Sequence, residues 1–171
     1  ISRYRLCIDH ARLKTAQGDL EGALALLDEA QHLYIRSPLP DFCPISAMKA
    51  RIWVAQGKVA RALEWVRELG LTPDDDLHYL REFEHVTLAK ILIAKCQKEG
   101  TAASINSVIR FLDRLLQAAE GGGRMGSVIE ILILQAVAYQ AKGDLTPAIN
   151  SLERALTQAE PEGYVRIFNE G

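Results

Sequence analysis

A short alanine-bounded segment occurs four times along the 171-residue chain. Each copy has six residues and begins and ends with alanine, at residues 11–16, 50–55, 89–94 and 136–141. The starts are 39, 39 and 47 residues apart, and a polar residue and a glycine directly follow three of the copies. The third copy departs from this pattern, because its glycine comes later. Self-similarity at such a period is typical of architectures in which one structural unit is stacked on the next.

A second repeated segment follows the glycine in the first, second and fourth copies. It spans residues 19–30, 58–69 and 144–155. In each, a small residue is followed by an apolar or small residue four positions later and by another three positions after that, which places all three on one stripe of an α-helix. The glycine can adopt the left-handed conformation that ends the first helix, and Asp19 and Asp144 are suited to cap the second. The pattern predicts two helices in each unit.

Proline, glycine and acidic residues mark the ends of the predicted helices. These helices span residues 2–17, 20–35, 42–56, 59–69, 75–98, 102–120, 127–142 and 145–159, with a partial helix over 162–170. The acidic run 74–76 is expected to begin the fifth helix, near the positive end of its dipole. Ser127 and Glu130 have the spacing of a capping box for the seventh helix. The segment 159–163 is expected to end the eighth.

Composition limits the classes of partner. Twenty basic and 22 acidic residues give a net charge of −2, so global charge provides no attraction to nucleic acid or to an anionic membrane. The longest apolar run, residues 128–138, is interrupted by polar residues and is too short for a membrane span. Cys7, Cys43 and Cys96 are far apart, which favours reduced thiols in a cytoplasmic protein over disulfides or a zinc site. The chain begins with Ile1 and shows no signal peptide, and we expect a fragment of a longer protein.

The pattern of small residues around the glycine resembles the tetratricopeptide repeat. Its positions are Ala11, Gly18, Ala23, Leu27 and Ala30 in the first copy, Ala50, Gly57, Ala62, Val66 and Leu69 in the second, and Ala136, Gly143, Ala148, Leu152 and Ala155 in the fourth. Trp53 and Tyr139 match the usual aromatic of the first helix, but Lys14 and Leu92 depart from it, and the units exceed the family's usual length. The last sixteen residues, 156–171, resemble more specifically the helical-repeat domain of large ATP-dependent LuxR-type transcription regulators, the MalT-like group.

This resemblance implies an all-α fold, a right-handed superhelix of about four tetratricopeptide-like hairpins plus a partial terminal helix. One domain would cover residues 1–171, with repeats over 2–35, 42–69, 75–120 and 127–159. An ordinary helical bundle with accidental similarity is the alternative. The resemblance further implies a sensor module of a LuxR-type transcription activator that binds a small-molecule inducer or a regulatory protein. A nucleotide-binding domain and a helix-turn-helix domain would flank the module in the parent protein, so that ATP and DNA belong to the parent and not to this chain.

In tetratricopeptide stacks, the residue after the first alanine of the first helix usually faces the concave side, and the resemblance implies the same here. These residues are Arg12, Arg51, Lys90 and Val137, with Arg5 one helical row earlier. A row of cations suits carboxylates or phosphates. Apolar residues near the row favour a mixed groove for a small organic ligand or a peptide; they are Ile8, Val54, Ile93 and Ile133, with the aromatic residues Trp53, Trp65, Tyr139 and Phe83. The alternatives are an ordinary solvated face for the charges and core packing for the aromatic residues.

No arrangement of residues predicts catalysis, and we expect no catalytic residue, cofactor or metal ion in this chain. His78, Glu82 and His85 share one helix face, but they extend along about 10 Å of it, and a solvated face is the better interpretation. The stretch 121–126 matches a dinucleotide fingerprint, yet a helical pattern precedes it where that motif needs a strand. The remaining alternatives are a generic tetratricopeptide scaffold that binds a peptide or protein partner, and an enzyme with a hidden site. Helix faces exposed at the two ends make self-association a further expectation.

Overall fold

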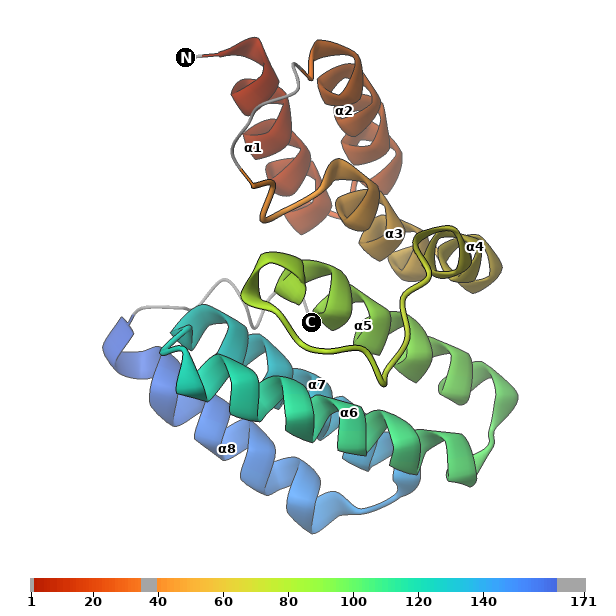
Figure 1. Cartoon of the computed structure of the whole chain (residues 1–171), viewed down its shortest axis with the longest axis vertical. Helices are drawn as coiled ribbons and strands as arrows, with labels where there is room; N and C mark the ends of the chain where they lie inside the picture. The colour runs from red at the N-terminus through yellow and green to blue at the C-terminus, as the bar shows by residue number, and fades with distance from the viewer. Residues whose placement is uncertain (1, 35–39, 163–171) are drawn as a thin grey trace.

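Helices account for most of the described structure. The computed structural model describes residues 2–34 and 40–162. Its α-helices are α1 (Arg3–Ala16), α2 (Leu20–Leu33), α3 (Ile45–Ala55), α4 (Val59–Leu69), α5 (Glu82–Glu99), α6 (Ala102–Gly121), α7 (Met125–Lys142) and α8 (Leu145–Glu162), and a 3-10 turn, η1 (Tyr79–Arg81), precedes α5. No residue in these two ranges lies in a strand, and the helices pack pairwise as hairpins, which confirms the predicted fold class (Figure 1). The partial helix predicted over 162–170 falls almost wholly outside the described residues.

The first, second and fourth hairpins are closed by the same backbone turn. In the first, Gly18 has a φ of +79°, and its N–H donates to the carbonyl three residues earlier while that of Asp19 donates to the carbonyl five residues earlier. The same two hydrogen bonds recur around Gly57 and Gly143. This φ is strained for any residue with a side chain, so the repeated glycine sets the turn, as predicted. The Asp19 carboxylate accepts from the N–H of Gly22 at 2.9 Å and caps α2.

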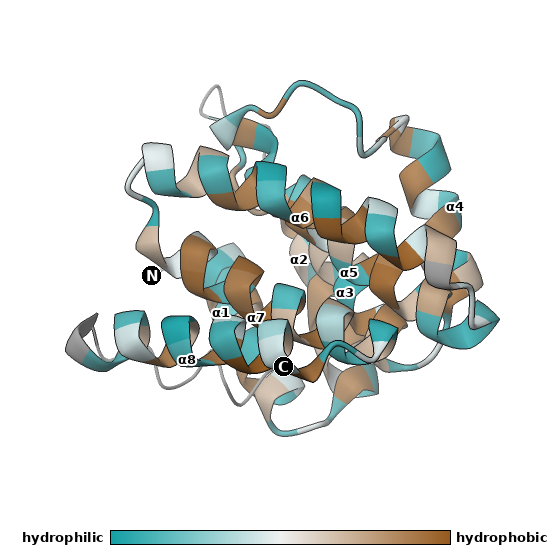
Figure 2. Ribbon diagram, turned by 90° about the horizontal axis from the view of Figure 1, so that it is seen from below, coloured by the Kyte–Doolittle hydropathy of each residue, from teal (hydrophilic) through white to brown (hydrophobic). Residues whose placement is uncertain are grey.

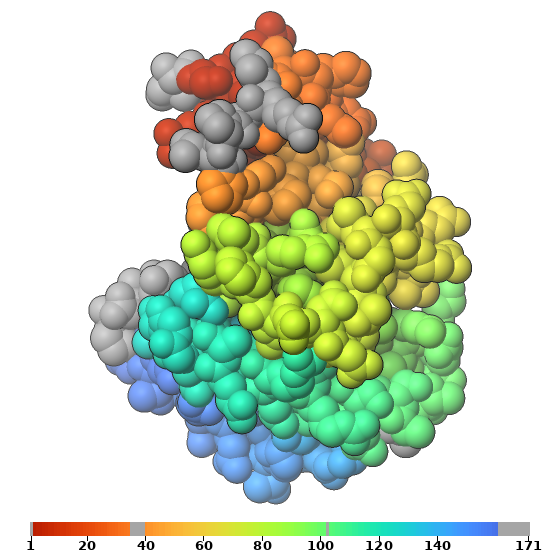
Figure 3. All heavy atoms as spheres, viewed as in Figure 1, coloured from red at the N-terminus to blue at the C-terminus, as the bar shows by residue number. Residues whose placement is uncertain are grey.

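The hairpins stack in chain order from the N-terminal pair to the C-terminal pair (Figures 1 and 3). Along this stack α2 packs on α3, α3 on α5, and α5 on α7. Three of the repeated alanines, Ala11, Ala50 and Ala89, have at most 1% of their surface exposed, and their small side chains let the helix axes approach closely. The fourth copy differs, because Ala136 is only partly buried and α7 buries Ala138 instead.

Two clusters of buried apolar side chains form the core. The larger cluster extends from α3 to α8, and the smaller one joins α1 and α2 to α3. Because α3 contributes Ala47 and Ala50 to the larger cluster and Ile45 and Ile52 to the smaller, it connects the first hairpin to the others. None of the described helices combines the length and the apolar composition that a membrane crossing requires.

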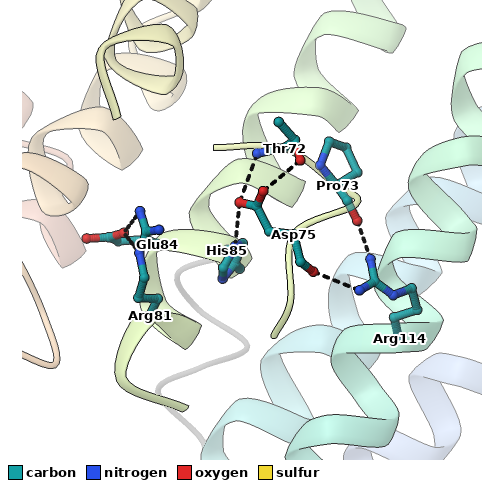
Figure 4. Close-up of polar contacts among 7 residues, drawn as sticks. All are labelled: Thr72, Pro73, Asp75, Arg81, Glu84, His85 and Arg114. Carbon is teal, nitrogen blue, oxygen red and sulfur yellow. Dashed lines mark hydrogen bonds and ion pairs between the residues drawn. The ribbon is translucent and has the colours of Figure 1, made fainter. Parts of the chain in front are cut away.

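The start of α5 departs from the prediction. The acidic run 74–76 was expected to open a helix at residue 75, but α5 begins at Glu82. Residues 71–78 instead form a strap, which lies between α5 and α6 (Figure 4). Arg114 of α6 holds the strap by donating to the backbone carbonyls of Pro73 and Asp75, the latter at 2.8 Å.

The carboxylate of Asp75 explains why no helix starts there. Its Oδ2 accepts from the backbone N–H of Thr72 at 3.0 Å, and its Oδ1 accepts from the Thr72 hydroxyl at 2.7 Å. His85, buried in α5, places Nε2 3.1 Å from the same carboxylate. The hydrogen bonds from Thr72, with a smaller contribution from His85, lower the pKa of Asp75 to about 2. Such local bonds from an aspartate compete with helix initiation.

The end of α8 also departs from the prediction, since the helix continues through residue 159 to Glu162. Ala159 belongs to the larger core cluster and is 4% exposed, so its packing keeps the last turn helical. The ribbon of α8 carries both hydrophilic and hydrophobic residues (Figure 2). A face of α8 next to its buried alanines carries exposed apolar side chains; they are Leu145, Ile149, Leu152 and Leu156. In longer repeat stacks, a face of this kind is covered by the next repeat.

Replacing Asp75 should release the strap from α5. We expect Asp75→Ala to lower the free energy of unfolding by about 1–3 kcal/mol near neutral pH, because the donors of Thr72 and His85 lose their acceptor. The pKa of Asp75 is lower in the folded chain than its ordinary value of 3.8, so this stabilisation is present above that value and is lost as the pH falls toward 2.

Urea denaturation of the two proteins over this pH range measures the difference. Asp74→Ala is the matched control, because Asp74 lies in the same strap and is exposed. Equal losses of stability in the two variants, or a difference that stays constant down to the lowest pH, would contradict the assignment.

Candidate binding cavity

The first helices of the four hairpins share a cavity of about 530 Å³. Its wall is formed by residues of α1, α3, α5 and α7, together with Leu27 of α2. We call it the inner cavity. Most of the wall is apolar, and its polar members are Arg12, Thr15, Arg51, Lys90 and Gln97. A mixed wall of this kind, largely apolar with a few polar anchors, is typical of sites for small ligands.

The structure brings together most of the residues predicted for the groove. Those that line the inner cavity are Arg12, Arg51, Lys90, Val137, Phe83, Val54, Ile93 and Ile133. Arg5 is exposed on α1 outside the cavity wall. Trp53 and Tyr139 also lie outside the wall and pack against the larger core cluster, with the guanidinium of Arg61 4.5 Å from the centre of the Trp53 ring. Ile8 packs in the smaller cluster, and Trp65 is buried in the larger one.

Arg51 is held on several sides by neighbouring helices. Its Nε donates to the hydroxyl of Thr87 at 2.7 Å, and its Nη1 donates to Oε1 of Glu130 at 2.7 Å. The guanidinium also stacks on Phe83, 3.8 Å from the ring centre, and Nη2 donates to the carbonyl of that residue at 3.4 Å. Because Thr87 and Phe83 belong to α5 and Glu130 to α7, this side chain of α3 joins three successive first helices.

Glu130 is the counter-charge of two cations. Its carboxylate lies 2.7 Å from Arg51 Nη1 and 3.9 Å from Lys90 Nζ. Burial by itself would raise the pKa of Glu130, but the positive charges of Arg51 and Lys90 and the hydrogen bond from Arg51 lower it overall. Glu130 is therefore ionised at neutral pH and anchors the cationic side of the cavity wall. On the side of the first hairpin, burial raises the pKa of the Cys43 thiol. The nearby positive charges of Arg12 and Arg51 lower this pKa by a smaller amount.

The role of Glu130 differs from the one that its sequence neighbours predict. Ser127 and Glu130 were expected to cap α7, but the helix begins at Met125, and Ser127 donates instead to the carboxylate of Glu82. The signal that could have revealed Glu130 is its place as a polar residue inside the longest apolar run. The other interruption of that run, Gln135, also bonds to another helix, donating to Asp113 of α6 at 2.7 Å.

The three residues considered as metal ligands have separate partners. His85 contacts Asp75 in the strap (Figure 4), and Glu82 pairs with Arg124 at 2.7 Å. His78 accepts from the backbone N–H of Leu80 at 3.3 Å. Within the described ranges, no group of three or more potential ligands is arranged to hold a metal ion.

Comparison with known proteins identifies the family. The family model of the MalT-like TPR region matches residues 6–171. The chain belongs to this family. No curated protein and no solved structure matches the chain. The MalT-like TPR region is a repeat scaffold typical of LuxR-type regulators, in agreement with the resemblance found in the repeats and in the last sixteen residues.

In this MalT-like TPR region, removal of either partner of the Arg51–Glu130 pair should destabilise the stack. We expect Arg51→Met and Glu130→Gln each to lower the free energy of unfolding by about 1–3 kcal/mol, because each leaves a partly buried charge without its partner. The double variant should lose less than the sum of the two, since both remove the same interaction.

Chemical denaturation of the four proteins gives this coupling energy. Arg3→Met is the matched control, because Arg3 pairs with Glu29 while its side chain is 75% exposed, and its removal should cost under about 0.5 kcal/mol. Strictly additive losses would show that the pair does not couple α3 to α7.

Proposed function

We propose that this chain is the effector-binding sensor module of a LuxR-type transcription activator. The observation that carries the proposal is the inner cavity, to which the first helices of the four hairpins contribute side chains. The family supports the regulator context, since MalT-like TPR regions are typical of LuxR-type proteins. In the parent protein, a nucleotide-binding domain would precede the repeats and a helix-turn-helix domain would follow them. ATP and DNA would bind to those domains.

A ligand bound in the inner cavity would directly affect how the four hairpins are arranged. A ligand there contacts side chains from Arg12 in the first hairpin to Val137 in the fourth. It therefore binds best when the hairpins have one particular spacing and rotation. Ligand binding shifts a population of arrangements only when it favours one of them, and contacts with four hairpins provide that difference. The flanking domains of the parent would respond to the arrangement that the ligand selects.

The proposal assigns no catalytic step to the cavity. Among the described lining residues, Thr15 has the single hydroxyl group, and it donates to the carbonyl of Ala11 at 2.9 Å. The titratable groups of the lining, Arg12, Arg51 and Lys90, are cations suited to holding an anion. A nucleophile next to a general base, the usual basis of covalent catalysis, is not assembled from these lining residues.

Filling the cavity tests the proposal. Val137→Trp places a large side chain in the partly buried wall of the fourth hairpin, and Ile149→Trp makes a matched change on the exposed face of α8. The chain and both variants are screened by thermal shift against sugars, organic acids, nucleotides and short peptides. We expect at least one compound to stabilise the unmodified chain and Ile149→Trp but not Val137→Trp. Compounds that stabilise all three proteins equally would place binding outside the inner cavity.

The identity of the bound compound separates the proposed sensor from a peptide scaffold. Binding confined to short peptides favours the scaffold, whereas binding of a metabolite favours the sensor. The gene provides a second test, because the proposal expects a nucleotide-binding domain encoded upstream of these repeats and a helix-turn-helix domain downstream. A coding sequence without those two domains would contradict the assignment to a LuxR-type activator.

A further inference from the structure

The wall of the inner cavity is mostly hydrocarbon. Apolar side chains of α1, α2, α3, α5 and α7 form the larger part of it, and three of them, Leu27, Ile52 and Ile93, are at most 4% exposed. Others, such as Val54 and Val137, are partly buried and present apolar surface to the cavity. The volume of about 530 Å³ is that of a site for a small organic molecule. Most of the contact available to a ligand here is therefore apolar.

The cations of the wall face anions of the protein itself. Arg51 donates to Glu130, and Lys90 lies 3.9 Å from the same carboxylate, so neither cation is without a partner. Arg12 lies 3.9 Å from Asp9, and its side chain is 48% exposed. At such an exposed position, water and salt weaken the attraction between a cation and the charge of a ligand. Charge alone therefore gives a ligand little affinity for this wall.

The neutral polar groups of the wall lead to the same conclusion. The Thr15 hydroxyl donates to the carbonyl of Ala11 at 2.9 Å, and Gln97 is exposed. In a site built for a polar ligand, buried polar groups stay unpaired until the ligand supplies their partner. Among the described residues, the buried side-chain nitrogen and oxygen atoms that lack a partner all lie outside the cavity wall; they belong to Gln56, Trp65, His85 and Gln158. A ligand rich in hydroxyl groups would lose its hydrogen bonds with water and regain few of them here.

We propose that the inner cavity binds an apolar organic molecule with at most one polar end group. Its hydrocarbon body lies against side chains such as Val54, Ile133 and Val137, and its polar end, where it has one, stays in solvent. The affinity comes from the apolar surface that ligand and wall together remove from water. This inference rests on the proposed function, because it takes the cavity as the site of the effector. Of the compounds in the thermal-shift screen, the least polar acids and peptides are then the ones expected to bind.

A series of alcohols tests whether apolar surface provides the affinity. 1-Hexanol, 1-octanol and 1-decanol are titrated into the full chain by isothermal calorimetry, with glucose as the polar comparison. We expect binding to become about tenfold tighter for each two methylene groups added, because each methylene buries further apolar surface. The heat-capacity change of binding should be negative, which is the mark of apolar burial. Glucose should bind more weakly than any of the three alcohols.

Charged probes of the same length test the role of the cations. Octanoate and octylammonium have hydrocarbon chains that match that of 1-octanol, and they differ from it in the end group. We expect neither to bind more tightly than 1-octanol, because the cations of the wall have partners or are exposed. Raising the salt concentration should change the affinity for 1-octanol by less than about twofold, since no ion pair is formed.

Matched variants assign the binding to the inner cavity. Val54→Thr and Val137→Thr nearly keep the shape of the side chain and place a hydroxyl group in the wall. Each should weaken 1-octanol binding about fivefold, because that hydroxyl loses water when the ligand covers it. Ile149→Thr is the control on the exposed apolar face of α8 and should leave the affinity unchanged. Circular dichroism verifies that each variant is folded, and the alcohol series on the unmodified chain does not depend on them.

Several results would overturn the proposal of an apolar ligand. They are an affinity that does not increase along the alcohol series, tighter binding of octanoate, octylammonium or glucose than of 1-octanol, unchanged binding in both valine variants, and no binding of any probe. A loss in Ile149→Thr equal to that in the valine variants would place the alcohols on α8 instead. The proposed function fails separately. If a polar compound binds the chain but not Val137→Trp, the inner cavity remains the effector site and the class of ligand inferred here is wrong.

Discussion

The ion pair between Arg51 and Glu130 holds together the wall on which the inner cavity depends. It connects α3 to α7, and the same guanidinium contacts α5 through Thr87 and Phe83. Buried alanines such as Ala50 and Ala89 let these helices approach, but a smooth contact of small side chains permits several sliding positions. Directional hydrogen bonds favour one of these positions. The cavity has a defined wall because close approach and a fixed register occur together.

Local chemistry explains how much of the fold could be predicted from the sequence. Glycine at a position that requires positive φ, an aspartate one residue later and apolar residues spaced by three or four positions determine a hairpin from neighbouring residues alone. Most predicted helix ends accordingly fall within three residues of the observed ones. The inward row of Arg12, Arg51, Lys90 and Val137 could be located for a related reason, since a fixed offset from a packing alanine defines a direction on a helix.

The features that could not be predicted depend, wholly or in part, on contacts with residues from other helices. From its sequence neighbours, Asp75 looks like the start of a helix. In the structure its carboxylate instead accepts from Thr72 and contacts His85, and Arg114 of α6 holds the strap around it. Glu130 lies 79 residues from Arg51, and its local neighbours suggest a helix cap. In both cases an acidic residue satisfied a local rule for a helix start, yet other contacts determined its position: bonds from Thr72 with help from His85 for Asp75, and the distant Arg51 for Glu130. Tertiary contacts of this kind outweigh a local preference of about 1 kcal/mol.

The same long-range pairing changes the meaning of the predicted row of cations. A uniform row would offer each positive charge equally to a ligand, whereas here Arg51 is committed to the protein itself. Its guanidinium suits that task, because a planar group with five donors can satisfy acceptors from two helices and stack on a ring at once. Glu130 is ionised and lies close to both Arg51 and Lys90, so the wall tolerates these two neighbouring cations. Positions that look alike in the repeats therefore differ in their structural roles, because partners from two other helices fix Arg51 in the wall.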